Sequence, residues 1–339
     1  MYKILDFDHG LGGLSNGMEF FNDFEVIGAP WLNKKTSLCY NVNHKNLFEV
    51  GNYDLNCDYD IALFNPHFGD NFLRRGSSNF DFSEINWVMN FLKLSQPDYA
   101  IISTKPEVVQ YLGDMMLPTY TADNWPVYDY VCFGLKDFYN IFQFVIDGAD
   151  YGVPQHKKLN FYLCVHKEAH FTNLSFPAKN YSIKKGFVTI QDAIGDIEED
   201  DYSAYSSDFI NFCRQDNPRL TWHKCKFNKQ KQCSYIQEGG SAKTTKELTQ
   251  QTGYIRPKYH KVCPNLDFEF YRLSSKKASL HPVMNRPFTI REGARLFGLP
   301  DTYVWNTELK NREVALMIYN AISPIFGRVI AEILNAAIA

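Results

Sequence analysis

Short apolar runs alternate with longer mixed segments along the first half of the chain. Five of these runs are predicted to be β-strands, because apolar and β-branched residues are concentrated in them: 2–7, 24–28, 60–64, 99–103 and 160–165. Helix-like patterns lie between the strands, most clearly at 82–94 and at 14–21. Strands that alternate with helices indicate a parallel, doubly wound sheet with helices on both faces.

The pattern becomes irregular between residues 167 and 280, where polar and basic residues interleave with aromatic ones. It is regular again from residue 281 to the end of the chain. We therefore expect two domains. An α/β domain would be formed by 1–166 together with 281–339, and an inserted, β-rich domain by 167–280.

Two helices are predicted in the last part of the chain. The first covers 289–296, with Thr289 as its N-cap and Glu292 three residues later as the second half of a capping box. Pro300 follows it and would stop the helix. The second is an apolar helix over 320–337, which would close the α/β domain.

A glycine-rich turn directly follows the first predicted strand. Gly10, Gly12 and Gly13 lie in the run DFDHGLGGLSNG (6–17), between that strand and a helix-like segment. In this arrangement backbone N–H groups can approach an anionic or nucleotide-like ligand. A sharp reversal of the chain also requires glycine, so the turn by itself leaves both interpretations open.

Composition narrows the class of protein. The chain has 339 residues, of which 45% are hydrophobic and 16% aromatic, which is typical of a globular protein with a substantial core. No apolar run approaches the roughly 20 residues needed to cross a bilayer, and the first residues lack the pattern of a signal peptide. We therefore expect an intracellular protein without membrane contact, in the cytoplasm or the nucleus. The eight cysteines show no paired spacing, which favours reduced thiols.

Basic residues are concentrated in one stretch, although the whole chain carries a net charge of −3. Residues 214–261 hold eleven lysines and arginines against three acids, interleaved with aromatic residues. Such a stretch is typical of a surface that follows phosphates, and a solvated face of a small domain is the alternative. His223, Cys225 and Cys233 fit no strong zinc pattern, so no metal is expected. The residues expected to contact DNA phosphates are Lys224, Lys226, Lys229, Lys231, Arg256 and Lys258.

Several short motifs are spaced over nearly the whole chain. They are the glycine-rich run, YGVPQ (151–155) followed by Lys157, VTIQDAIGD (188–196), Arg256, PNL (264–266), HP (281–282), RPFTIREGARL (286–296) with PD (300–301), and NAISP (320–324). Together, and in this order, they resemble the motifs of the DNA cytosine-5 methyltransferase family. The glycine-rich run resembles that family's cofactor motif, and YGVPQ with Lys157 its GVPQ-x-R-x-R strand. VTIQDAIGD resembles the lead-in to the target-recognition region, and Arg256 an arginine that supports this region.

The resemblance implies an α/β, Rossmann-like fold of the S-adenosylmethionine-dependent methyltransferases, with an inserted, β-rich target-recognition domain. It also implies double-stranded DNA in the cleft between the domains, and a target cytosine that is flipped out of the stack. Arg286, Arg291 and Arg295 would brace a helix. The positions that would bind S-adenosylmethionine are Asp8, His9, Gly10, Gly12, Trp31 and Asn320.

The positions that this family uses for catalysis carry other residues here. The family attacks the cytosine ring with a cysteine thiolate, protonates the ring with a glutamate and holds the base with an arginine. In this chain His67 stands at the cysteine position, Ser103 at the glutamate position and Leu159 at that of the second arginine, which leaves Lys157. An imidazole does not form the reversible adduct of a thiolate, and a lysine lacks the fork of an arginine.

The cofactor positions differ as well. Asp8 replaces the family's phenylalanine before the glycines, and Trp31 stands near the position of the acid that binds the ribose. Asn33 is too weak an acceptor to restore that charge, and Tyr319 replaces a glycine before Asn320. S-adenosylmethionine is therefore a candidate cofactor, and its loss is the alternative.

Three interpretations follow, and they leave open whether the chain is an enzyme. The favoured one is a pseudoenzyme that no longer methylates cytosine and that binds DNA, or serves as a subunit for a partner protein or a second copy of itself. The second is an enzyme of altered chemistry on a flipped base, with Asp8, His9, His67 and Lys157 as its polar groups. Its target would be an already modified pyrimidine or a different base, or its methyl donor would be a different one. The third is an ordinary cytosine-5 methyltransferase that uses Cys57 as its nucleophile.

Overall fold

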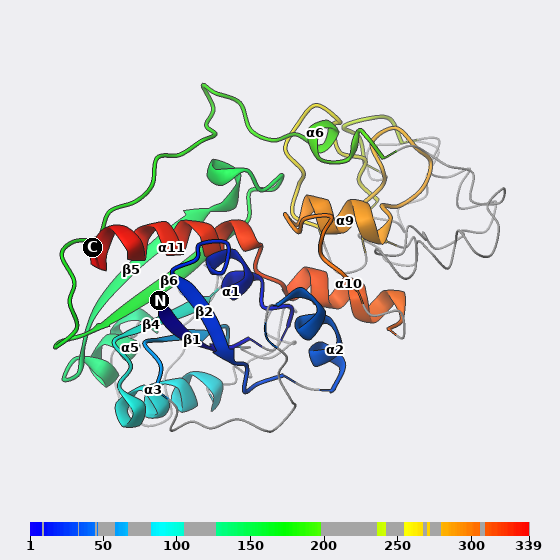
Figure 1. Ribbon diagram of the computed structural model, residues 1–339. Helices are drawn as coiled ribbons and strands as arrows, with labels where there is room; N and C mark the ends of the chain where they lie inside the picture. The colour runs from blue at the N-terminus through cyan, green and yellow to red at the C-terminus, as the bar shows by residue number, and fades with distance from the viewer. Residues whose placement is uncertain are drawn as a thin grey trace, which may run out of the picture.

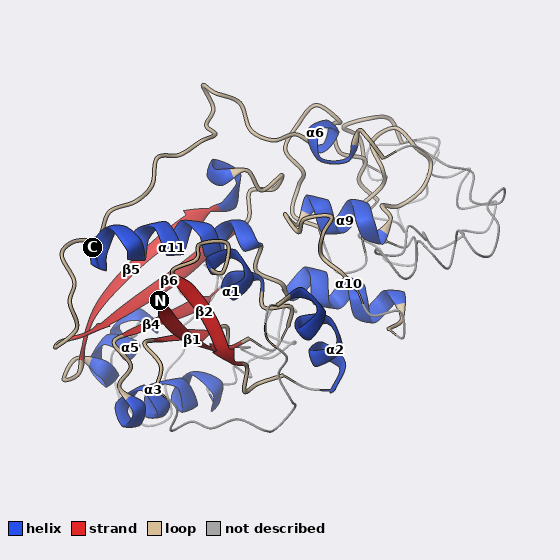
Figure 2. Cartoon of the chain, viewed as in Figure 1, coloured by secondary structure: helices blue, strands red, loops and turns tan. Residues whose placement is uncertain are grey.

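The structure contains a six-stranded sheet with the strand order β2-β1-β3-β4-β6-β5, whose strands are the red arrows in Figure 2. Strands β1 to β4 are parallel, and β6 runs antiparallel to both β4 and β5. The strands are β1 (Tyr2–Phe7), β2 (Phe24–Gly28), β3 (Ile61–Phe64), β4 (Tyr99–Thr104), β5 (Tyr139–Asp147) and β6 (Lys158–His166). The five predicted strands are confirmed, whereas β5 was not predicted. A wholly parallel sheet is wrong, because β5 and β6 are joined without the helical crossover that a parallel pair needs.

The chain is traced in a computed structural model (Figure 1), which describes residues 1–8, 10–32, 34–44, 46, 58–66, 83–104, 127–197, 236–241, 254–266, 270–271, 279–305 and 309–338.

Helices cover both faces of the sheet. On one face lie α1 (Gly13–Met18) and α11 (Pro324–Ile338), and on the other lie α3 (Ser83–Ser95) and α5 (Val127–Leu135) (Figure 1). Alternate residues of each strand enter the two cores: Ile4 of β1 packs with α1 and α11, whereas Leu5 packs with α3 and α5. This packing, with the sheet between two layers of helices, is the doubly wound arrangement that the sequence predicts.

Two glycines after the turn let α1 and α11 approach each other backbone to backbone. A Cβ added at Gly13 would lie 1.8 Å from the carbonyl oxygen of Ile322, and one at Gly17 would lie 1.9 Å from that of Pro324. On the facing helix, a Cβ at Gly327 would lie 2.0 Å from the carbonyl oxygen of Leu14. Part of the glycine content of the first motif therefore serves helix packing.

A second core lies beside the sheet and is built around α6 (Ile190–Ile194), α9 (Ile290–Leu296) and α10 (Asn311–Asn320). The predicted helix at 289–296 is confirmed, including the Thr289 cap. This core also contains residues from the expected inserted domain, such as Cys263 and Phe270. The domain boundaries at 167 and 280 stay a prediction.

The last helix differs from its prediction. A single helix over 320–337 was expected, whereas α10 ends at Asn320 and α11 begins at Pro324. Proline lacks the N–H that would continue a helix, and it is well tolerated in a first turn. The stretch Asn311–Ile338 is long and apolar enough to cross a membrane, but 67% of its most apolar part is buried inside the structure, as in the core helix of a globular protein.

Candidate functional site

Polar side chains connect the carboxyl ends of three neighbouring strands. Asp8 follows β1, Asn65 follows β3 and Ser103 lies near the end of β4. The amide of Asn65 donates to Asp8 Oδ1 over 3.4 Å, and the hydroxyl of Ser103 lies 3.3 Å from Asn65 Oδ1 and donates to the Phe64 carbonyl over 3.1 Å. Sheets of this kind bind their ligands at this edge, so we take these residues as the candidate site.

The glycine turn at this edge is hydrogen-bonded to the carboxylate of Asp8. One oxygen of Asp8 accepts the backbone N–H of Gly10 over 2.9 Å, and the other accepts that of Gly12 over 3.1 Å. Asp8 is only 4% exposed. Gly12 has a φ of +62°, a conformation that other residues adopt only with strain. The turn therefore binds a carboxylate that belongs to its own chain.

A second buried carboxylate lies behind the turn. Asp6 accepts hydrogen bonds from the hydroxyls of Ser15 and Tyr40, the latter over 2.7 Å. Burial, and then the neighbouring charge of Asp8, raise the pKa of Asp6 from its ordinary value of 3.8 to about 6, although both hydrogen bonds and the nearby His44 oppose this change. The hydrogen bonds that Asp6 accepts from Ser15 and Tyr40 therefore come from neutral hydroxyl groups and not from cations.

Helix α2 (Lys34–Asn43) holds the turn from behind. The ring of His44 stacks on Tyr40 with centroids 3.8 Å apart, and His44 Nδ1 lies 2.9 Å from Glu19 Oε2. A Cβ added at Gly12 would lie 2.2 Å from the Tyr40 ring and 2.5 Å from His44 Nε2. Sequence reasoning missed this group. The signals that could have found it were the polar Asp6 within an apolar strand and the Tyr40–His44 spacing of four residues.

The positions equivalent to the family's catalytic residues are only partly described. Ser103 is buried and hydrogen-bonded as above. Lys157 donates from Nζ to the carbonyl of Ala321 over 2.7 Å, and Nζ lies 5.1 Å from the centre of the Phe297 ring. Leu159 belongs to the core on the α11 face of the sheet. His67 lies outside the described residues, as does Cys57.

The expected cofactor residues do not all meet. The structure brings Asp8, Gly10 and Gly12 together in the turn. Trp31 instead packs against Phe7, with ring centroids 5.5 Å apart, in the aromatic cluster beside α3. Asn320 is the last residue of α10. His9 and Asn33 lie outside the described residues.

The expected DNA-contacting residues also divide. Lys258 is exposed, as a phosphate contact requires. Among the other candidates, the four lysines at 224, 226, 229 and 231 lie outside the described residues, as do His223, Cys225 and Cys233. Within the described part of the chain no three His, Cys, Asp or Glu residues are grouped as metal ligands.

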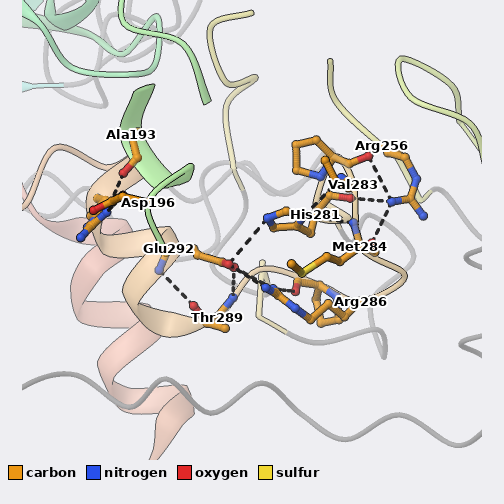
Figure 3. A network of polar contacts seen from close by, with 12 residues as sticks. Ala193, Asp196, Arg256, His281, Val283, Met284, Arg286, Thr289 and Glu292 are labelled. Carbon is orange, nitrogen blue, oxygen red and sulfur yellow. Dashed lines mark hydrogen bonds and ion pairs between the residues drawn. The ribbon is translucent and has the colours of Figure 1, made fainter. Parts of the chain in front are cut away.

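Arg256 is a bracing residue rather than a surface cation, which corrects its expected contact with phosphate. Its side chain is buried, and Nε donates to the carbonyl of Ile236 over 2.6 Å. One terminal nitrogen donates to the carbonyls of His281 and Met284 over 2.6 and 2.7 Å (Figure 3), and the other to the side chain of Asn285 over 2.8 Å. The guanidinium is thus engaged inside the protein, in agreement with the supporting role that the resemblance implies for Arg256.

A buried ion pair lies next to Arg256. Arg286 forms a two-pronged contact with Glu292, with both N–O distances at 2.8 Å, and Glu292 also accepts the backbone N–H of Thr289 over 2.7 Å (Figure 3). The hydroxyl of Thr289 accepts the N–H of Glu292 in return, which completes the capping box. Burial and the two neighbouring arginines lower the pKa of His281 to about 4 against the pull of Glu292, so this ring is neutral at physiological pH.

The other two arginines of the motif also brace α9. Arg291 lies 2.9 Å from Asp301, and Arg295 reaches the same residue at 2.6 Å. Arg295 further contacts Asp196 and donates to the carbonyl of Ala193 over 3.1 Å, which ties α9 to α6. These contacts agree with the expected bracing role.

Comparison with known proteins points to one family. The family model of C-5 cytosine-specific DNA methylases matches residues 133–336. The chain is 20% identical over 288 residues to the Type II methyltransferase M.DdeI of Desulfomicrobium norvegicum, a match that covers 72% of this chain and 64% of that protein. The chain thus spans less than two thirds of the curated relative that it matches.

Solved structures show the same fold. The structure is similar to a prophage-encoded protein of E. coli assigned as a DNA modification methyltransferase, with a TM-score of 0.69 and 18% identity. It is also similar to Dnmt2 of S. pombe, with a TM-score of 0.63 and 16% identity. Each match covers 99% of both chains. The predicted α/β methyltransferase fold is confirmed.

Proposed function

Because the chain belongs to the family of C-5 cytosine-specific DNA methylases, we propose that it is a DNA-binding member that no longer methylates cytosine through a thiolate. The observation that carries the proposal is the pair of catalytic positions. His67 follows Pro66 where the family has its cysteine. Ser103 stands at the position of the family's acid, and its hydroxyl donates a hydrogen bond to the Phe64 carbonyl.

Neither replacement supplies the missing chemistry. The thiolate works because sulfur is a strong nucleophile at neutral pH and because its bond to a ring carbon can be reversed. A serine hydroxyl is not an acid at neutral pH, and the Ser103 hydroxyl already donates within the protein. The core position of Leu159 offers no donor to hold a base.

DNA binding is supported by the parts that the chain retains. The basic stretch at 214–261 carries eleven cationic residues against three acids, and Lys258 within it is exposed. The paired arginines and Glu292 keep the adjoining scaffold in place. Contacts of lysines with phosphates give affinity without sequence information, so we propose duplex DNA as the partner and no particular recognition sequence.

The family uses S-adenosylmethionine, but the described part of the glycine turn does not fit it well. The N–H groups of Gly10 and Gly12 are already accepted by Asp8, and the ring of Trp31 lies in an aromatic cluster.

Two measurements on the full chain test the proposal. Incubation with labelled S-adenosylmethionine and duplex DNA should give no 5-methylcytosine, while an active cytosine-5 methyltransferase under the same conditions gives it. Fluorescence anisotropy with duplex DNA should show binding that weakens steeply with salt. Labelled cytosine C5 would overturn the loss of methylation, and the absence of salt-dependent binding would overturn the DNA-binding role.

A second candidate, altered base chemistry, is favoured by the hydrogen-bonded row of Asp8, Asn65 and Ser103 at the strand ends. Carboxylates at such an edge can move protons without a thiol. Mass spectrometry of DNA nucleosides from cells that carry the wild-type protein or His67→Ala tests it. A modified nucleoside that depends on His67 would support altered chemistry, and identical profiles would count against it.

A further inference from the structure

The amides of the glycine turn already have an acceptor. Each backbone N–H has one proton to donate, and those of Gly10 and Gly12 donate to the two oxygens of Asp8 over 2.9 and 3.1 Å. Asp8 is anchored by a third contact, since its Oδ1 also lies 3.4 Å from the amide nitrogen of Asn65. A ligand carboxylate could bind these two N–H groups only after the Asp8 carboxylate had left them.

The turn itself has little freedom to offer other donors. The hydroxyl of Tyr303 donates to the carbonyl of Leu11. The rings of Tyr40 and His44 press against Gly12, and the Ile322 carbonyl presses against Gly13, so closely that no Cβ would fit at either glycine. With the backbone held on these sides, the movable part of the turn is the Asp8 side chain.

Charge acts in the same direction as the hydrogen bonds. Asp8 is close enough to Asp6 to raise the pKa of Asp6, so the region behind the turn already carries a negative potential that is unfavourable for a further anion. An incoming carboxylate or phosphate would add a third negative group to this buried region, which costs more at low dielectric than at the surface.

We propose that Asp8 is an internal ligand of the glycine turn, which excludes the carboxylate of an amino-acid-bearing adenosyl ligand. The turn keeps the family's shape, but its own side chain occupies the donors. Adenosine derivatives without a carboxylate do not compete for these donors, so Asp8 does not affect their binding. The inference shares with the proposed function only the family's cofactor, and it needs neither DNA nor methyl transfer.

Isothermal titration of the full chain tests this with two probes, S-adenosylmethionine and 5′-deoxy-5′-methylthioadenosine, which lacks the amino-acid part. Asp8→Ala frees both amides. In the wild-type protein the ligand carboxylate must first displace the charge-assisted hydrogen bonds of Asp8, whereas in the variant it need not, so binding of S-adenosylmethionine should strengthen at least about tenfold. Binding of the second probe should change less than about twofold. Asp23→Asn, which removes an exposed acid before β2, controls for net charge and should change neither affinity.

Asp8→Asn has nearly the same shape as the wild-type residue and keeps the test informative if the alanine variant does not fold. It removes the charge but leaves one acceptor oxygen, so its gain for S-adenosylmethionine should be smaller than that of Asp8→Ala but of the same sign. An equal gain for both probes would overturn the proposal, because it would indicate a generally wider pocket. No gain in either variant would overturn it as well.

Amide hydrogen exchange supplies a measurement without any ligand. In the wild-type protein the amides of Gly10 and Gly12 should be protected, and in Asp8→Ala they should exchange at least about tenfold faster while those of β1 stay unchanged. Equal exchange in both proteins would show that Asp8 does not hold the amides. Since neither experiment contains DNA, its outcome is independent of whether the proposed loss of methylation holds.

Discussion

Two buried carboxylates, Glu292 and Asp6, lie in opposite surroundings. Burial by itself would raise the pKa of Glu292, but the hydrogen bonds and charge of Arg286 outweigh it, and this pKa is lowered. Asp6 has two hydroxyl partners and a like charge nearby, and its pKa is raised to about 6. A paired charge stabilises the folded chain, whereas an unpaired one is tolerated at a cost.

This contrast distinguishes the scaffold around α9 from the ligand edge, by which we mean the carboxyl ends of β1, β3 and β4. Around Arg286 and Arg295 every cation of the motif has an acid opposite it, so these residues are explained by stability alone. The strand ends carry Asp6 and Asp8 without such partners in their described contacts. A buried carboxyl with a raised pKa, such as that of Asp6, is typical of functional sites, which indicates that this edge of the sheet was shaped by something other than stability.

The largest expected effect tests the paired side of this comparison. Glu292→Ala leaves the buried guanidinium of Arg286 without its partner and removes half of the capping box, so we expect a loss of about 3 to 5 kcal/mol in the free energy of unfolding. Urea denaturation followed by circular dichroism measures it. Asp196→Ala is the control, because that acid side chain is 69% exposed and such a pair contributes less than about 1 kcal/mol. Equal losses in the two variants would contradict the comparison.

The next effect tests the unpaired side. Because folding raises the pKa of Asp6 from 3.8 to about 6, the folded chain holds this proton more tightly than the unfolded chain. The resulting stability is present below about pH 4 and is lost as the pH rises through about 6. The loss amounts to about 3 kcal/mol.

Asp6→Asn should remove this dependence. Relative to the wild-type protein, its free energy of unfolding should gain about 3 kcal/mol between pH 4 and pH 8. Urea titrations at five pH values measure the difference, and Asp23→Asn should follow the wild-type profile. Parallel profiles for Asp6→Asn and wild type would show that burial and the charge of Asp8 do not raise the pKa of Asp6.

Most of the fold could be predicted because its signals are local. The buried strands of the sheet are continuous apolar runs, and the capping box of α9 can be recognised from Thr289 and Glu292, three residues apart. The missed elements lack such signals. β5 lies at the edge of the sheet with several half-buried residues, and α2 has no clear apolar stripe.

The site was less predictable because its contacts cross the chain. Asp8 could be identified as a departure from the family, but its bonds to Gly10 and Gly12 depend on how the turn folds back. The partners of Asp6 include Tyr40, which lies 34 residues away. For Arg256 the sequence showed a positive charge in a basic stretch, whereas burial determines what that charge does.

A third prediction separates Arg256 from its exposed neighbour. Arg256→Lys keeps the charge but cannot donate to carbonyls on several sides at once, so we expect a loss of about 2 kcal/mol in the free energy of unfolding. Lys258→Ala should leave stability unchanged within about 0.5 kcal/mol. In DNA-binding titrations it should reduce the salt slope by about 1. The reverse assignment, with stability at Lys258, would show that the burial of the two residues has been misjudged.

The smallest effect concerns Ser103, where scaffold and ligand edge meet. Ser103→Ala removes the donor to the Phe64 carbonyl and the contact with Asn65, so we expect a loss of about 1 kcal/mol. Ser95→Ala is the matched control: its hydroxyl also donates to a backbone carbonyl, that of Phe91, but near the end of a surface helix, and its loss should stay below about 0.5 kcal/mol. If Ser103 only supports the strand ends, the alanine variant will bind DNA as the wild-type protein does. A change in DNA affinity or in nucleoside products at unchanged stability would instead place this hydroxyl in contact with a base.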